Sequence, residues 1–172
     1  IATLTKRKCH TDLLEALLKT NNLLNVNLVG YPTETKIKDL IESNLSVNGK
    51  QIKSNINYFP KLSQKDLCLL LLFSSAYVST SKDEGFGIPL LEAHLYNVPL
   101  IIRNIEIHRE LFPNSKFFEN NYDLIDLLNQ IKPLSKDEIK KRQKNLLNIN
   151  EENLIGLFNY SNLSSKLNTL IK

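Results

Sequence analysis

The chain of 172 residues has a mass of 19.7 kDa, which suits one domain with a sizeable hydrophobic core. Its residues are 42% hydrophobic and 23% charged, the composition of a soluble globular protein, and no apolar run approaches the roughly 18 residues of a transmembrane helix. The net charge of +4 is spread along the predicted helices. This argues against a nucleic-acid-binding protein and leaves contact with an anionic membrane surface open.

Two further features concern the protein in the cell. Cys9 and Cys68 are isolated and lack metal-ligand spacing, which predicts a reduced, cytoplasmic protein, with peripheral contact at the inner face of the membrane as an extension of this prediction. The chain contains no methionine, and Ile1 already lies in an apolar, strand-like run. We therefore expect a fragment of a longer protein.

From the N-terminus onwards, apolar runs that predict strands alternate with segments of helical periodicity. The predicted strands are residues 1–4, 25–29, 56–59, 77–78, 98–102 and 116–118. The predicted helices include those with apolar faces at Leu13, Leu14, Leu17 and Leu18, at Ile37, Leu40, Ile41 and Leu45, and at Leu124, Leu127, Leu128 and Ile131. This alternation predicts a single doubly wound α/β domain over residues 1–172, with a Rossmann-like parallel sheet of about six strands.

Short local signals predict where several elements begin and end. Ser63 followed by Asp66 predicts a helix N-cap, and Ser135 followed by Glu138 predicts a capping box. Residues 48–49, Asn-Gly, predict a turn. Asn97 is expected to end a helix in the left-handed conformation, and apolar residues at helical spacing predict a C-terminal helix over residues 161–172.

The stretch from residue 76 to 103 predicts a strand, a loop, a helix and a further strand. Gly85 and Gly87 allow the backbone to approach a ligand, and Pro89 suits the first helical position. The helix N-terminus would then face the C-terminal edge of the sheet and form a phosphate site. Glu84 and Glu92 flank this site, and carboxylates beside a phosphate suggest hydrogen bonds from sugar hydroxyls on both sides, as in a nucleotide sugar.

The string from Glu84 to Glu92, with seven residues between the two glutamates, closely resembles the signature of the retaining family-4 glycosyltransferases, also called glycosyl transferases group 1. The resemblance implies a GT-B fold, of which this chain would be the C-terminal, donor-binding half. It also implies that Glu84 contacts the transferred sugar and that Glu92 contacts the ribose hydroxyls. The diphosphate would bind the backbone of the loop and of the first helical turn, at Gly85, Phe86, Gly87 and Ile88.

Two other loops resemble parts of the same family's donor site. Lys8 aligns with the lysine of a basic pair that holds the diphosphate, whereas Thr3 stands where many members have arginine. Either Arg7 supplies the second positive charge, or the basic run at residues 6–8 is a solvated loop. The backbone near Lys61 and Leu62 corresponds to a loop that lies against the nucleotide base. Thr80 and Asn97 stand where the family usually has proline and glycine.

The resemblance implies retaining transfer of a sugar from a nucleoside-diphosphate sugar to a saccharide or lipid-linked acceptor, in surface polysaccharide or glycan synthesis. Lys8, Arg7 and the helix N-terminus would stabilise the departing diphosphate, so we expect no metal and no other cofactor. His94 and His108 have no neighbours with metal-ligand spacing and are expected to be structural or surface residues. The N-terminal acceptor domain would be absent from this chain, which alone should not catalyse transfer.

Three alternatives remain open at the level of the sequence. A sugar phosphorylase or a nucleotide-sugar epimerase with the GT-B fold would use similar phosphate and carboxylate groups. A non-catalytic nucleotide-sugar-binding domain would bind the donor without turnover. A flavodoxin-like receiver or binding module shares the alternation of strands and helices but does not account for the pairing of Glu84 with Glu92.

Overall fold

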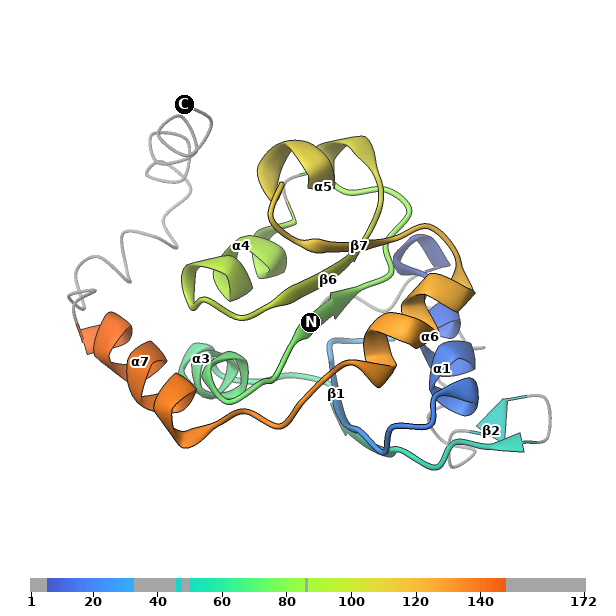
Figure 1. Cartoon of the computed structure of the whole chain (residues 1–172), viewed down its shortest axis with the longest axis horizontal. Helices are drawn as coiled ribbons and strands as arrows, with labels where there is room; N and C mark the ends of the chain where they lie inside the picture. Colours follow the sequence, from blue (N-terminus) through green and yellow to red (C-terminus); the bar gives the residue numbers. More distant parts are fainter. Residues whose placement is uncertain (1–5, 33–45, 48–49, 86, 148–172) are drawn as a thin grey trace.

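Figure 1 shows the computed structural model of the chain, which describes residues 6–32, 46–47, 50–85 and 87–147. Several predicted features lie outside these residues. They are the strand at residues 1–4, the helix with its apolar face at residues 37–45, the turn at residues 48–49 and the helix at residues 161–172.

The described parallel strands form two hydrogen-bonded groups. In one, β1 (Asn25–Val29) pairs with β4 (Asn55–Phe59), with Asn25 opposite Asn55. In the other, β6 (Leu100–Arg103) lies between β5 (Tyr77–Ser79) and β7 (Lys116–Phe118). The sequence predicted each of these five strands, but as parts of one continuous sheet. A short antiparallel pair, β2 (Ser46–Val47) with β3 (Lys50–Gln51), was not predicted.

Helices lie along the chain before, between and after these strands. In order they are the 3-10 helix η1 (Lys6–Lys8), α1 (His10–Lys19), α3 (Gln64–Leu72), α4 (Ile88–Leu95), α5 (Glu106–Leu111), α6 (Asn121–Asn129) and α7 (Lys136–Leu147). Figure 1 shows α1 and α6 side by side. Within the described residues, no helix is both long enough and apolar enough to span a membrane.

Two hydrophobic cores lie on opposite faces of the β5–β6–β7 sheet. Ile101 belongs to the core built with α1 and α6, whereas its neighbours Leu100 and Ile102 belong to the core built with α3, α4 and α5. Successive side chains of a strand point to opposite faces, so β6 separates the two cores by alternation. Helices therefore cover both faces of the sheet, which confirms the predicted doubly wound, Rossmann-like α/β class.

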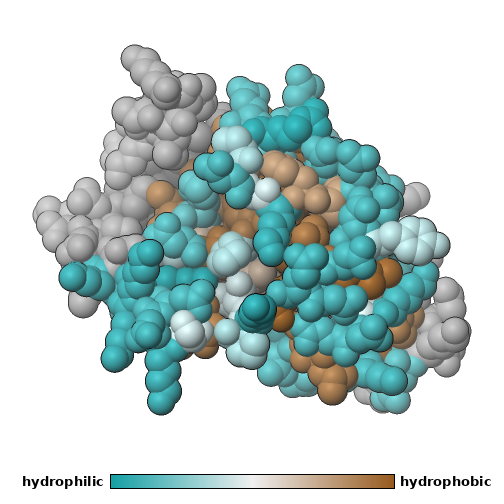
Figure 2. Space-filling view, viewed as in Figure 1, coloured by the Kyte–Doolittle hydropathy of each residue, from teal (hydrophilic) through white to brown (hydrophobic). Residues whose placement is uncertain are grey.

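Figure 2 shows hydrophilic residues over most of the visible face, with hydrophobic residues between them.

The predicted helix ends are found at the residues expected. The Ser63 hydroxyl accepts a hydrogen bond from the Asp66 backbone N–H at 3.1 Å, and the Glu138 carboxylate accepts one from the Ser135 backbone N–H at 2.9 Å. Asn97 has a φ of 54°, and the N–H of the following Val98 donates to the Ala93 carbonyl at 2.9 Å. This left-handed residue turns the chain from α4 toward β6.

Candidate functional site

The candidate site is built around the N-terminus of α4. Gly87 is the N-cap with a left-handed φ of 61°, and its carbonyl accepts hydrogen bonds from the N–H groups of Leu90 and Leu91, at 2.7 and 3.0 Å. Because α4 begins at Ile88, Pro89 is the second helical residue rather than the first. No side chain caps this end of the helix. Pro89 has no N–H, and those of Leu90 and Leu91 are already bonded, so the N–H groups of Gly87 and Ile88 are the ones available to an anion here.

The two signature glycines have different surroundings. A Cβ atom at Gly87 would lie 3.0 Å from the Leu90 Cδ1 atom, and the left-handed backbone there would strain any other residue. A Cβ atom at Gly85 would have no atom within 4 Å, and Gly85 is not left-handed. Gly87 is thus required by the chain itself, whereas Gly85 leaves open space beside the loop. Phe86, between them, lies outside the described residues.

The residues predicted from two distant parts of the chain meet here. The Lys8 ammonium group forms an ion pair with the Glu84 carboxylate, and their side chains are only 16% and 10% exposed. Arg7 contacts the neighbouring Asp83, with 3.2 Å between Nη1 and Oδ2, but this pair is largely exposed. A part-buried pair interacts more strongly than an exposed one, because less water screens the charges. Lys8 is therefore the more strongly held of the two predicted cations.

Two hydrogen bonds to backbone carbonyls of η1 hold it against the loop that follows β5. The Thr80 hydroxyl donates a hydrogen bond to the Lys8 carbonyl oxygen at 2.8 Å. The Lys82 N–H donates to the Arg7 carbonyl oxygen at 3.2 Å. The two segments therefore lie side by side at the carboxyl end of β5, and the carboxyl ends of strands are where ligands bind in open α/β sheets.

Glu92 lies about one turn into α4, as predicted, but its burial was not predicted. The residue is only 8% exposed. Burial raises the pKa of the Glu92 carboxyl group above its usual range, and a hydrogen bond with the Gln64 side chain opposes this shift. Burial also raises the pKa of the Tyr77 hydroxyl, with smaller contributions from the charges of Glu84 and Glu92. The two signature carboxylates thus act on one buried tyrosine, which the sequence analysis did not single out.

Two charged residues that support the site, Arg103 and Asp12, were missed by the sequence analysis, and His108, expected to be structural or at the surface, contacts one of them. Arg103, at the end of β6, donates from Nε to the Thr80 carbonyl at 2.9 Å and from Nη2 to an Asp12 carboxylate oxygen at 2.5 Å. His108 is buried, and its Nδ1 atom lies 2.8 Å from the Arg103 carbonyl oxygen. Burial lowers the pKa of His108. No local signal marks these contacts, because their partners come from other loops.

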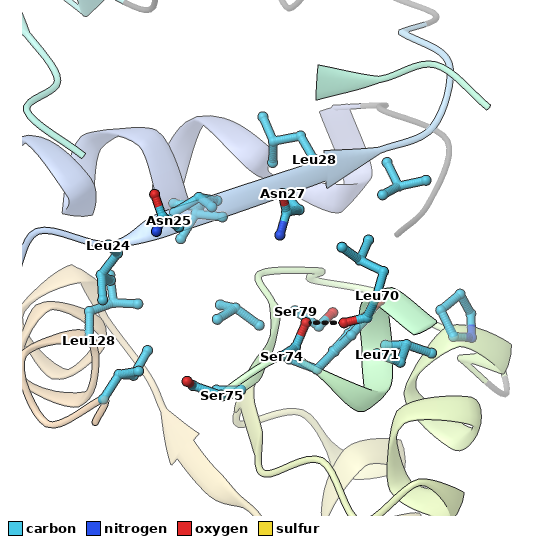
Figure 3. Close-up of a pocket in the computed structure, with 18 of the residues that line it drawn as sticks. Leu24, Asn25, Asn27, Leu28, Leu70, Leu71, Ser74, Ser75, Ser79 and Leu128 are labelled. Atoms are coloured by element: carbon cyan, nitrogen blue, oxygen red, sulfur yellow. Dashed lines mark hydrogen bonds between the residues drawn. The ribbon is translucent and has the colours of Figure 1, made fainter. Parts of the chain in front are cut away.

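A cavity of about 610 Å³ lies between β1 and β5, the two facing strands of the separate sheets. Figure 3 shows Asn25 and Asn27 on the β1 side of this space and Ser75 and Ser79 on the β5 side. The residues that line it also include Lys8, Glu84, Gly87 and Pro89 of the candidate site. The site therefore has open space beside it.

The remaining predicted positions contribute less. Lys61 is exposed and Leu62 half-buried in the loop between β4 and α3, and neither is among the described residues that line the cavity. His94 is exposed and contacts the Phe112 ring edge to face, with 5.6 Å between ring centroids. In the part of the chain that the structure describes, no group of three or more His, Cys, Asp or Glu residues could hold a metal ion.

Comparison with known proteins agrees with the geometry. The model of a family described as glycosyl transferases group 1 matches residues 1–152. The chain is 33% identical over 73 residues to the O-antigen chain mannosyltransferase RfbU of Salmonella typhimurium, covering 42% of this chain and 21% of that protein. It is 28% identical over 117 residues to the serotype-specific mannosyltransferase WbdA of Escherichia coli, covering 64% of this chain and 14% of that one.

A solved structure resembles the fold over most of its length. The catalytic domain of cholesterol-alpha-glucosyltransferase from Helicobacter pylori superposes with a TM-score of 0.62 at 16% sequence identity, covering 90% of this chain and 94% of that one. This likeness shows the shared fold. The chain spans about a fifth or less of the length of the curated relatives that it matches.

Proposed function

The chain belongs to the glycosyl transferases group 1 family, and from that premise we propose that it is the donor-binding domain of a retaining, GT-B glycosyltransferase of polysaccharide synthesis. The observation that carries the proposal is the contact of Lys8 with Glu84 beside the glycine-capped N-terminus of α4. It brings together a cation, free backbone N–H groups and a carboxylate. A diphosphate needs the first two, and a sugar hydroxyl needs the third.

In this proposal, the diphosphate of the donor binds at the start of α4. It binds the N–H groups near Gly87 and Ile88 at the positive end of the helix dipole, and it also contacts Gly85 and Phe86. Lys8 supplies a positive charge. Its attraction for the diphosphate strengthens as negative charge develops on the departing group. Arg7 has a weaker effect on the diphosphate, because water screens its exposed charge and Asp83 already contacts it. No metal ion is required in this proposal.

The two glutamates take different parts of the donor. Burial makes an ionised Glu92 costly in the free chain, and ribose hydroxyls would supply hydrogen bonds to the carboxylate. Glu84 would accept hydrogen bonds from the transferred sugar, and its ion pair with Lys8 would open or be shared when the donor binds. The backbone at Lys61 and Leu62 would lie against the base.

We further propose mannose as the transferred sugar, since the names of two curated relatives describe mannosyltransferases. The acceptor, a saccharide or a lipid-linked saccharide, would bind a second, N-terminal domain that closes the cleft. Catalysis then depends on both domains, because the acceptor hydroxyl must be held close to the sugar carbon. A cytoplasmic enzyme with peripheral contact at the inner face of the membrane would suit a lipid-linked acceptor.

The test is nucleotide binding to the chain. UDP, GDP and ADP are each titrated at up to millimolar concentration, with melting temperature and calorimetry as readouts. We expect one of them to bind, and Glu92→Ala to weaken its binding by about 1.5–3 kcal/mol, the range of a hydrogen bond to a charged group. Glu84→Ala should barely change the binding of the bare nucleotide, since it lacks the sugar.

The matched control is Glu15→Ala, which removes an exposed carboxylate from α1. It should bind the nucleotide as the wild type does. If none of the three nucleotides binds the chain, or if Glu84→Ala and Glu92→Ala cause equal losses, the proposed assignment of the site is wrong.

A further inference from the structure

Thr80 links the end of β5 to the end of β6 and to η1. It follows β5 directly and is 4% exposed. Its carbonyl oxygen accepts a hydrogen bond from Arg103 Nε at 2.9 Å, and its hydroxyl donates one to the Lys8 carbonyl oxygen at 2.8 Å. Arg103 ends β6, which pairs with β5 in register. Thr80 is thus held by the sheet on one side and holds the backbone of Lys8 on the other.

The backbone at Lys8 has a conformation that needs such support. The chain passes from η1 into α1 through Cys9, which is left-handed with φ 49° and ψ 41°. Residues other than glycine rarely adopt this conformation and do so where the surrounding structure enforces it. The carbonyl of Lys8 belongs to the peptide group that leads into Cys9. The hydrogen bond from Thr80 therefore orients this peptide group.

We propose that the Thr80 hydroxyl is a positioning group for Lys8. It holds the backbone so that the ammonium group reaches Glu84 in the free chain and the diphosphate in the donor complex; the second contact rests on the proposed function. The hydrogen bond to the Lys8 carbonyl is therefore a way of placing the cation that depends on the Thr80 hydroxyl.

A purely structural role for Thr80 would have different consequences. Its carbonyl contact with Arg103 uses the main chain and survives replacement of the side chain. Thr80→Val keeps the shape of the side chain and removes only the hydroxyl. If that hydroxyl only stabilises the fold, its loss lowers the melting temperature alike whether or not Lys8 is present. If it positions Lys8, the effects of the two residues are coupled, which a double-mutant cycle measures.

The first experiment uses no ligand. Lys8→Ala leaves Glu84 unpaired in a part-buried position and should lower the melting temperature by several degrees in the wild-type background. In the Thr80→Val background, the same change should cost less than half as much. The control Thr20→Val, at the opposite end of α1, should leave the full effect of Lys8→Ala. Equal losses in the Thr80→Val and wild-type backgrounds would overturn the inference.

The second experiment measures binding of whichever of UDP, GDP and ADP gives the largest thermal shift. Thr80→Val should weaken binding about 3–10-fold, the range of one hydrogen bond, and Thr80→Ser should restore it to within about twofold. In the Lys8→Ala background, Thr80→Val should change the affinity less than about twofold. Wild-type affinity in Thr80→Val, or equal weakening in both backgrounds, contradicts the inference.

Two provisions keep the outcomes separate. Thr80→Ala is a second variant without the hydroxyl and replaces Thr80→Val in both experiments if that variant does not fold. If the wild-type chain binds none of the three nucleotides, the proposed function fails. The ligand-free experiment still decides whether Thr80 positions Lys8.

Discussion

Lys8 and Glu84 form an ion pair although 76 positions separate them in the sequence. The pair joins η1 to the loop before α4, and both side chains are mostly shielded from water. Each group balances the charge of the other in the free chain. A donor that uses both groups must therefore replace or share this contact, so the pair links the stability of the free chain to the binding of its ligand.

Removing Lys8 should destabilise the folded chain. We expect Lys8→Ala to lower the free energy of unfolding by about 1.5–3 kcal/mol, because it leaves a part-buried carboxylate without its charged partner. Adding Glu84→Ala should cost less than the two single losses together. Urea unfolding measures both. The control is Arg7→Ala, whose partner contact is exposed and should be worth less than about 1 kcal/mol. A larger loss for Arg7→Ala than for Lys8→Ala would contradict this ranking.

Glu92 should make stability decrease as the pH rises. Burial raises its pKa, so the folded chain binds the proton more tightly than the unfolded chain does. The free energy of unfolding should then fall as the pH rises from the ordinary value of about 4.5 through the raised pKa. Glu92→Gln should remove this loss and leave the chain at least as stable at pH 7, while weakening nucleotide binding. The control, Glu110→Gln on the exposed part of α5, should keep the wild-type pH dependence.

The two signature glycines should respond differently to the same change. Gly87→Ala should lower stability, because its Cβ meets Leu90 and its backbone is left-handed. Gly85→Ala should fold with nearly wild-type stability, since the added Cβ meets nothing. If the donor approaches this loop closely, Gly85→Ala should nevertheless weaken nucleotide binding. Thermal unfolding and calorimetry separate these effects, and wild-type binding by Gly85→Ala would show that the ligand does not approach there.

His10 should destabilise the chain in acid. Burial, together with the positive charge of Lys8, lowers its pKa to about 4. The unfolded chain takes up the proton near pH 6.5 and the folded chain does not, so stability is lost as the pH falls from about 6.5 toward 4. The loss is at most about 3 kcal/mol, from 1.36 kcal/mol per pKa unit. Buried His108, whose pKa is also lowered, contributes in the same direction.

Replacing His10 with glutamine tests how much this histidine contributes to the loss of stability in acid. His10→Gln should flatten the decline in the free energy of unfolding between pH 6.5 and 4, leaving the part due to His108. The same replacement at exposed His94 should keep the wild-type decline. Urea unfolding at several pH values provides the comparison. An unchanged decline in His10→Gln would show that this histidine is not responsible.

The chain alone should bind the donor without transferring its sugar. The proposed site holds donor groups only, and lost positioning of the acceptor can forfeit about 7–11 kcal/mol of barrier reduction. A transfer assay with radiolabelled donor compares this chain with a longer form that also carries the proposed acceptor domain. We expect slow hydrolysis at most from the chain. Transfer by the chain at a rate comparable with that of the longer form would refute the two-domain proposal.

Much of the fold could be predicted from sequence because the signals are local. Apolar runs predict the strands and a period of about 3.6 residues predicts the helices, and the Ser63 cap and the left-handed Asn97 follow from the chemistry of single residues. The glycine-capped start of α4 was likewise predicted, within one residue of its observed position. The separation of the strands into two hydrogen-bonded groups was not, because pairing depends on where distant segments pack.

For the candidate site, the identity of the residues could be predicted from the sequence, but the contacts between them could not. The sequence predicted which residues would carry the proposed chemistry, since Glu84, Glu92 and the glycines lie in one short string and Lys8 in one loop. Only the tertiary structure decided that Lys8 contacts Glu84, that Thr80 holds the Lys8 carbonyl and that Glu92 is buried. These relationships depend on strand register and helix packing. Both arise from contacts between segments far apart in the chain, which no local pattern of residues records.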